Sequence, residues 1–506
     1  MRSTTPRRSA GESFRLRVEA VLAFSLATAV ALAACSKPTG TLQAAAETLK
    51  ASEIKSIEYS GTGRWFQFGQ APNATLPWPQ FEVSSFTAAI NYETPAARVQ
   101  MTRKQTVDPA RARPTPADVR SDQHVSGTAA WNMAAPAGAA AGAPPAPQAQ
   151  PATVEERTME IWSTPHGFLK AAQANNATSQ AVDGGSDVSF TAGTHKYVGR
   201  INAQNQVERV QTWIDNPVLG DTLVETTFSE YRDFSGTSFP GHIVRTQGGY
   251  PVLDLTISAV TSNPAVDLPV PESVGAATVP PIVATAEKLA DGVYYMKGGT
   301  HHSVAIDQAD HIVVVEGPQS EARSLAVIAK VKETIPNKPL RYLINTHVHF
   351  DHSGGLRTWV DEGATIVTHQ MNKPYYEQVW AAPRTLNPDR LAQSKKSATF
   401  ETLSDKHVLT DGKRAIEIYE IAGSGHNDGF LMIYLPKEKI LIEGDAYTPL
   451  AVGAPPPALN PYSVNLHENI QRLKLDVRQI AALHGPRLTT MADLRSAIGL
   501  AGNASN

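Results

Sequence analysis

The chain has 506 residues, a length that favours two or three domains rather than one. Hydrophobic residues make up 42% of the sequence, which is ample material for folded cores and excludes a wholly disordered chain. The formal net charge of −3, without a local run of lysine and arginine, argues against a nucleic-acid-binding protein.

The first 35 residues have the pattern of a bacterial export signal. Arginines at positions 2, 7, 8, 15 and 17 precede an apolar stretch over residues 20–34, which is too short to span a bilayer comfortably. The stretch ends in Leu32-Ala33-Ala34-Cys35, which resembles the lipobox whose cysteine becomes the lipid-modified first residue of a bacterial lipoprotein. We expect a signal peptide over residues 1–34 and lipid modification of Cys35. The alternative is an ordinary signal peptide that is cleaved nearby.

An exported lipoprotein of this kind would be anchored in the cell envelope by its N-terminal lipid alone and would face the periplasm. Cys35 is the only cysteine in the chain, so an intramolecular disulfide cannot form. Because no other thiolate is available, any metal site must be built from histidine and carboxylate side chains.

Residues 36–265 are expected to form a mainly antiparallel β domain. A short amphipathic helix is predicted over residues 41–54, and beyond it the pattern is typical of strands. The clearest strand covers residues 253–259, where apolar side chains alternate strictly with Asp254, Thr256 and Ser258.

Two segments of unusual composition interrupt these patterns. Residues 134–153 are rich in alanine, proline and glycine and carry no charge, so we interpret them as a flexible surface insertion. Residues 266–284 are rich in proline and are predicted to link the β domain to the region that follows.

A helix followed by many antiparallel strands is loosely similar to the half-barrel of periplasmic lipoprotein carriers. That resemblance implies an apolar, cupped surface that holds acyl chains or docks a partner. The alternative is a plain β accessory domain that positions the rest of the chain.

From residue 289 onward the pattern becomes α/β. The predicted elements are short strands over residues 293–296, 303–306 and 312–315, a helix over residues 321–334, and a buried strand over residues 341–345. The apolar run stops at Asn345, and Gly354-Gly355 opens another predicted helix. The residues between them are therefore expected on a strand-to-helix loop, where layered sheets usually display ligands.

Residues 347–352 on this loop read His-Val-His-Phe-Asp-His. Side chains two positions apart on an extended segment point the same way, so His347 and His349 can share one metal. Asp351 and His352 lie past the bend and are expected to face a second metal. Imidazole and carboxylate groups suit zinc, and manganese or iron can bind the same atoms. A histidine-rich surface loop is the alternative interpretation.

Three further strand ends or loops each carry one residue that can bind a metal. His426 lies in the glycine-rich segment 423–429, Asp445 ends the apolar run that begins at residue 440, and His484 ends the run that begins at residue 480. Their order along the chain follows the first motif.

Together these motifs resemble the metallo-β-lactamase superfamily over roughly residues 289–500. The resemblance implies an α+β chain whose catalytic domain, residues 285–506, is a four-layer αβ/βα sandwich with its site between the two sheets at one edge. It implies seven metal ligands in two sets that share one bridging carboxylate: His347, His349 and His426 in the first, Asp351, His352 and His484 in the second, and Asp445 between them.

Three more residues are weaker candidates for the site. His301 and His302 fall where the family often places a residue that lines the pocket, although a surface role is equally compatible with the sequence. Glu316 follows a predicted strand and could accept a hydrogen bond from a ligand histidine. A simple turn carboxylate is the alternative.

The resemblance implies a zinc-dependent hydrolase with two metal ions and a small-molecule substrate. A metal-bridging hydroxide, oriented by Asp351, would attack an ester, thioester, lactone or amide. β-Lactam hydrolysis is the second choice, because β-lactamases of the family generally lack an aspartate at the position of Asp445 and some use a cysteine.

Two functions of other classes stay open. The domain could be an iron-dependent oxidoreductase, as some relatives of this fold are. The chain could also be chiefly an envelope lipoprotein that binds a lipid or a partner through its β domain.

Overall fold

The computed structural model describes residues 40–136, 142–451 and 458–500. The predicted signal peptide over residues 1–34 and the predicted lipidation site Cys35 lie outside the described residues. Within the described ranges, none of the helices combines the length and the apolar character needed to cross a membrane.

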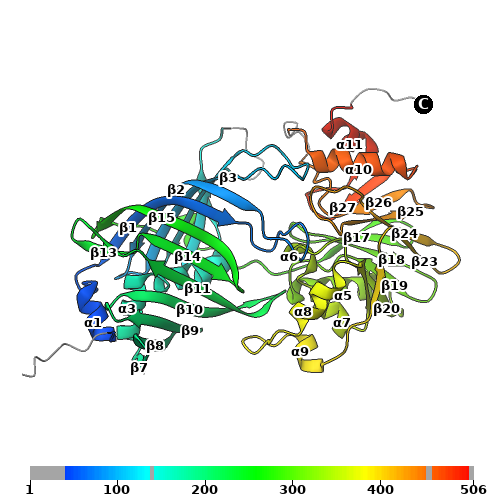
Figure 1. Ribbon diagram of the computed structural model, residues 1–506. Coiled ribbons are helices and arrows are strands. Elements are labelled where there is room, and N and C mark those ends of the chain that lie inside the picture. Colours follow the sequence, from blue (N-terminus) through cyan, green and yellow to red (C-terminus); the bar gives the residue numbers. More distant parts are fainter. Residues whose placement is uncertain (1–39, 137–141, 452–457, 501–506) are drawn as a thin grey trace, which may run out of the picture. The chain divides into compact units, whose positions relative to one another are not determined.

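The N-terminal region is built on one 13-stranded sheet in which every neighbouring pair is antiparallel (Figure 1). The first and the last long strands of the region pair with each other near the middle of this sheet. The strands, in their order across the sheet, are β6 (Ala146–Ala149), β5 (Ala129–Ala134), β4 (Asp118–Ser126), β3 (Ala96–Gln105), β2 (Gln80–Asn91), β1 (Ser56–Phe66), β15 (Tyr250–Ser262), β14 (His242–Gln247), β11 (Gly220–Ser229), β10 (Val207–Asn216), β9 (His195–Asn202), β8 (Gly185–Ala192) and β7 (Thr178–Val182).

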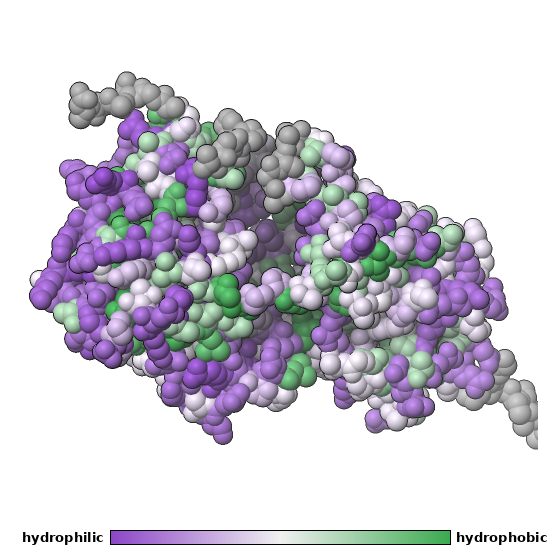
Figure 2. All heavy atoms as spheres, turned by 180° about the vertical axis from the view of Figure 1, so that it is seen from behind, coloured by the Kyte–Doolittle hydropathy of each residue, from purple (hydrophilic) through white to green (hydrophobic). Residues whose placement is uncertain are grey.

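One face of this sheet packs against three helices, α1 (Leu42–Thr48), α2 (Val154–Trp162) and α3 (Pro165–Ala174), around a shared apolar core. The predicted strand over residues 253–259 lies within β15, and its apolar members are buried from Leu253 to Ile257. Helix α1 is shorter than predicted because Lys50 adopts a positive φ of 51°, which ends the helix. The face drawn in Figure 2 is largely hydrophilic, with apolar side chains in small groups.

The prediction of a flexible insertion over residues 134–153 is wrong for its second half. β6 pairs with β5 along the edge of the sheet, and a 3₁₀ turn, η1 (Pro151–Thr153), leads into α2. Residues 137–141, at the centre of the segment, lie outside the described residues. The alanine- and proline-rich composition suggested a loop. An edge strand, however, tolerates Pro147 and needs no apolar alternation, because it pairs through its backbone.

The C-terminal region contains two sheets. The first has the order β16 (Thr285–Ala290), β17 (Val293–Lys297), β18 (Ser303–Asp307), β19 (Ile312–Val315), β20 (Leu340–Ile344), β21 (Thr365–His369) and β22 (Phe400–Leu403). The second has the order β23 (Lys406–Thr410), β24 (Ala415–Glu420), β25 (Leu431–Leu435), β26 (Ile440–Glu443), β27 (Gln479–Ala482) and β28 (Thr489–Thr490). Between β15 and β16 the chain forms only the short helix α4 (Glu272–Gly275).

Three apolar clusters show how these sheets are layered. One cluster contains side chains from both sheets and fills the space between them. A second lies between the first sheet and the helices α5 (Glu321–Thr334), α7 (Leu356–Asp361), α8 (Lys373–Trp380) and α9 (Arg390–Ser394). A third lies between the second sheet and the helices α10 (Pro461–Arg472) and α11 (Met491–Ala497). The predicted four-layer αβ/βα sandwich is therefore confirmed, as is the α+β class.

The buried side chain of His166, on α3, should make the stability of the β region depend on pH. Its side chain is fully buried, its Nε2 donates to the carbonyl of Leu49 over 2.9 Å, and burial lowers its pKa to about 4. In the unfolded chain, His166 has a pKa near 6.5 and takes up a proton more readily than in the folded protein. The folded state is therefore not penalised by this residue above pH 6.5, and it loses stability as the pH falls from 6.5 towards 4. We expect the free energy of unfolding to fall by about 2 kcal/mol from this residue between pH 7 and pH 5.

The substitution His166→Gln keeps a donor at this position and removes the titrating group. Urea unfolding at pH 7 and pH 5 should therefore show a smaller loss of stability on acidification in this variant than in the wild type. An equal loss in the two proteins would contradict the assignment to His166.

Candidate metal centre

Four segments of the C-terminal region meet at one edge of its two sheets. The segment after β20 carries His347 and His349 and continues into the one-turn helix α6 (Phe350–Ser353), which carries Asp351 and His352. The loop from β24 to β25 carries His426, and Asp445 and His484 follow β26 and β27. The motif 347–352 was expected on a loop, but its second half is a helical turn, and the rings of His347 and His352 lie with their centroids 4.3 Å apart across the bend.

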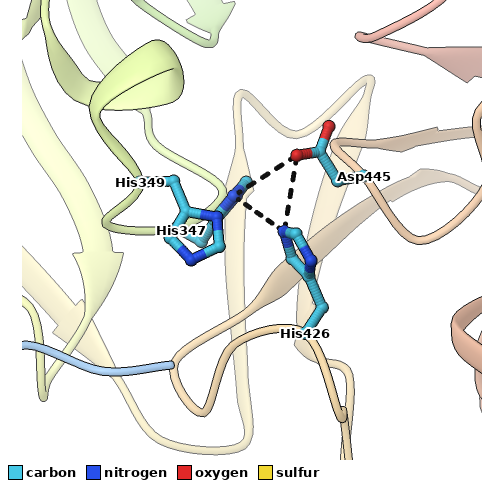
Figure 3. Close-up of side chains that lie close together, drawn as sticks. All are labelled: His347, His349, His426 and Asp445. Carbon is cyan, nitrogen blue, oxygen red and sulfur yellow. Dashed lines mark hydrogen bonds and ion pairs between the residues drawn. The ribbon is translucent and has the colours of Figure 1, made fainter. Parts of the chain in front are cut away.

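The first predicted ligand set lies close together in space (Figure 3). The ligand atoms of His347, His349, His426 and Asp445 all lie within 4.8 Å of one another. The Nε2 atoms of His347 and His426 are 3.3 Å apart, and they lie 3.8 Å and 3.4 Å from Asp445 Oδ2.

The second predicted ligand set lies on the other side of the same carboxylate. His352 Nε2 is 3.1 Å from Asp445 Oδ1 and 3.8 Å from Asp351 Oδ2. His484 Nδ1 is 3.3 Å from Asp445 Oδ1. The two oxygens of Asp445 therefore lie nearest to different ligand sets, and all seven predicted ligand residues come together in this centre.

Glu316 is fully buried beneath the centre and accepts hydrogen bonds on both carboxylate oxygens. Oε1 accepts from Asn345 Nδ2 over 3.1 Å, and Oε2 accepts from the Thr346 hydroxyl and from His352 Nδ1, the latter over 3.0 Å. His352 therefore carries a proton on Nδ1, and its Nε2 faces Asp445. Glu316 also has a positive φ of 74°, a conformation that is uncommon for a residue other than glycine.

The two weaker histidine candidates have different surroundings. His302 Nε2 donates to the carbonyl of Gly485 over 2.7 Å, so this side chain braces the segment that carries His484. His301 touches the centre directly, because its Nε2 is 3.1 Å from Asp351 Oδ2 and its ring stacks on that of His484 with centroids 4.3 Å apart. His301, Asp351 and His352 also form a group that could hold a metal ion.

Several residues at this centre were not predicted from the sequence. Glu443 is fully buried, its pKa is raised well above the ordinary value by burial, and Oε2 accepts from the backbone N–H groups of Ala446 and Tyr447, which shapes the turn around Asp445. The one available signal was a carboxylate at the end of an apolar strand. Gln70 and Ala71, from the β region, also contact the motif 347–352, and no local pattern marked either of them.

The chemistry of the residues present fits divalent metal ions. Among the seven predicted ligands, three buried atoms form no hydrogen bond with any residue that the structure describes, namely His349 Nδ1, His352 Nε2 and Asp445 Oδ1. Buried polar atoms rarely lack a partner, and imidazole nitrogens and carboxylate oxygens are the ligands that zinc binds. In both histidines the other ring nitrogen is occupied, by the Ala71 carbonyl and by Glu316.

The pKa values of these groups follow from burial and from their neighbours. Burial, together with nearby histidines, lowers the pKa of His347 well below its usual range and that of His349 to about 3, so both rings are neutral at pH 7. Burial opposes the charged forms of His352 and Asp445, yet their mutual attraction raises the pKa of His352 and lowers that of Asp445. A metal bound at His352 must therefore displace a proton.

One family model matches most of the region that carries this centre. Residues 296–483 match the family model described as the Metallo-beta-lactamase superfamily. The curated protein 2,4-dinitroanisole O-demethylase subunit alpha, from Nocardioides sp. (strain JS1661), is 22% identical over 166 residues. That match covers 32% of this chain and 45% of the relative, so the chain spans less than half of the relative's length.

Solved structures also match this chain. A metallo-beta-lactamase from Pontibacter korlensis is 17% identical, with a TM-score of 0.33, over 43% of this chain and 98% of that chain. The metallo-beta-lactamase FIM-1 from Pseudomonas aeruginosa, in its mono-zinc form, is 17% identical, with a TM-score of 0.34, over 43% of this chain and 95% of that chain.

The substitution Glu316→Gln tests how the centre is supported. A glutamine amide offers one acceptor oxygen where the donors around Glu316 use two, so the orientation of His352 should be lost. We expect zinc affinity, measured by competition with a chromogenic chelator, to fall about 10- to 100-fold. Unchanged affinity in a variant with a wild-type circular dichroism spectrum would show that Glu316 does not support the centre.

Proposed function

Because residues 296–483 form a metallo-β-lactamase superfamily domain, we propose that this protein is a hydrolase that uses two divalent metal ions, with zinc as the first choice. The observation that carries the proposal is the position of Asp445, whose Oδ2 faces one set of ligand atoms and whose Oδ1 faces another. A carboxylate shared in this way is the arrangement expected of a bridging ligand in a two-metal site.

Each residue of the centre has a role in this proposal. His347, His349 and His426 would hold one metal, Asp351, His352 and His484 would hold the other, and Asp445 would contact both. When bound, two such metals would lower the pKa of a water molecule and polarise a carbonyl group. Asp351, which is about one-third exposed, would accept a hydrogen bond from that water and orient it.

The substrate class is the finer part of the proposal. We propose a small molecule with an ester, thioester, lactone or amide bond, with a β-lactam as the second choice. The curated relative named as a 2,4-dinitroanisole O-demethylase subunit adds an aryl methyl ether to the substrates to be tested. An iron-dependent oxidoreductase is the competing function, and the identity of the bound metal would distinguish it.

We propose that the protein acts in the cell envelope as a lipoprotein that faces the periplasm. The support is the apolar stretch over residues 20–34, followed by Cys35. Metabolic labelling with a palmitate analogue, in the wild type and in a Cys35→Ser variant, would distinguish a lipid anchor from a simple cleaved signal.

A second candidate function is supported by a cavity of about 840 Å³ against the large sheet of the β region. Its walls include Trp65, Phe86, Met101 and Leu255, and the ion pair between Arg245 and Glu160 lies in the same wall. We propose that an apolar molecule such as an acyl chain binds here. Organic extraction of the purified protein, followed by mass spectrometry, would reveal a bound lipid, and a clean extract would argue against this function.

The proposed hydrolase makes a prediction about metal content. Elemental mass spectrometry of the purified protein should find about two zinc ions per chain. Turnover of at least one of nitrocefin, a lactone, an aryl acetate, a thioester or 2,4-dinitroanisole should be lost on chelation and restored by zinc. One iron per chain without hydrolysis would favour the oxidoreductase, and a folded protein without metal would contradict the proposed function.

The proposed role of Asp351 can be tested by Asp351→Asn, with the exposed Asp405→Asn as a matched control outside the centre. The loss of a carboxylate that binds metal and orients water should lower kcat/KM by about 10²- to 10⁴-fold. The control should keep wild-type turnover. Equal activity of the two variants would remove Asp351 from the mechanism.

A further inference from the structure

A segment of the β region, residues 69–73, lies against the motif that carries four of the proposed ligands. This segment follows β1 and precedes β2. The carbonyl of Gly69 accepts from Phe350 N over 3.1 Å, and the carbonyl of Ala71 accepts from His349 Nε2 over 2.9 Å. Because a carbonyl can only accept, His349 must carry its proton on Nε2, and its Nδ1 is the nitrogen left for a metal.

The same segment also holds the loop that carries His426. Ala71 O accepts a second hydrogen bond from Asn427 Nδ2 over 3.3 Å, and Pro72 O accepts from Asp428 N over 2.8 Å. The Asn73 side chain donates to Asp428 Oδ2 over 2.5 Å. Residues 69–73 therefore join two loops that lie on different sheets of the C-terminal region.

The close approach of the segment depends on a glycine. Gly69 has a φ of +74°, and a Cβ atom at this position would lie 2.6 Å from the ring of Phe350. Phe68 and Trp78, on either side of the segment, pack their rings against Phe350 with centroids 5.3 Å and 6.4 Å away. The backbone is thus fixed beside the motif, and this places the side chain of Gln70 next to Asp351.

Gln70 and His301 contact different oxygens of the Asp351 carboxylate. Gln70 Nε2 donates to Oδ1 over 2.8 Å, and His301 Nε2 is 3.1 Å from Oδ2. His301 Nδ1 lies 3.2 Å from the amide nitrogen of Gln319, which can only donate, so His301 carries its proton on Nε2 and donates to Asp351. Two side-chain donors from different parts of the chain therefore set the orientation of this carboxylate.

We infer that Gln70 is a positioning residue of the metal centre: its amide, supplied by the β region, orients Asp351 for the second metal. This inference rests on the proposed function. It assigns the β region a share in building the site, in addition to any role as an anchor or a binding domain. A metal held by Asp351, His352 and His484 would depend on Gln70, whereas Asp351 is not among the residues proposed to hold the other metal.

The experiment measures zinc binding to the full chain by competition with chelators, which resolves a tighter and a weaker metal. Gln70→Met keeps the length of the side chain and removes the donor. Gln67→Met is the matched control, because Gln67 lies just before this segment and its side chain forms no hydrogen bond in the part of the chain that the structure describes. Gln70→Ala is a second variant of smaller volume, in case the thioether disturbs the fold.

We expect Gln70→Met and Gln70→Ala to lower the affinity for one of the two zinc ions by about 10- to 100-fold and to leave the affinity for the other unchanged. The visible spectrum of the cobalt-substituted protein should change in only one of its two components. Two zinc ions bound with wild-type affinity in both Gln70 variants would overturn the inference and leave the proposed function intact. A wild-type chain that binds fewer than two metals would overturn the proposed function itself.

Discussion

The largely buried carboxylate of Asp445 is the constraint on which the rest of this centre depends. Burial alone would favour its neutral form, yet the charge of His352 and the close approach of the His426 and His484 rings hold its pKa well below the ordinary value. A buried carboxylate of this kind needs positive charge beside it. Protonated His352 can supply that charge in the metal-free protein, and the proposed metal ions would replace it. The fold satisfies this need by ending β20, β26 and β27 at one edge, with the loop after β24 beside them.

Buried polar groups around Asp445 hold the proposed ligand side chains in place. Glu316 orients His352, Glu443 shapes the turn that presents Asp445, and the Ala71 carbonyl orients His349. Each supporting group is itself held by several hydrogen bonds, which limits the freedom of the ligand rings. The β region contributes further through Arg111, which donates two hydrogen bonds, of 2.6 Å and 2.8 Å, to Asp428 on the loop that carries His426.

Local sequence patterns were sufficient to predict the elements that lead up to the motif 347–352. The predicted helix over residues 321–334 coincides with α5, and the predicted strands agree with β17 to β20 to within one residue at each end. The residues predicted to gather around the centre do so because each follows a strand end that the apolar pattern marks. Residues 134–153 were misjudged because edge pairing relies on backbone groups that composition does not reveal. Gln70 and Ala71 could not be predicted, since their contacts join residues about 280 positions apart.

We expect two metal ions in this centre, one on either side of Asp445. Anomalous diffraction at the zinc edge, from crystals of zinc-loaded protein, would locate them. We predict two anomalous peaks about 3.5–4 Å apart, one beside His347, His349 and His426 and the other beside Asp351, His352 and His484. A single peak, or peaks remote from Asp445, would contradict it.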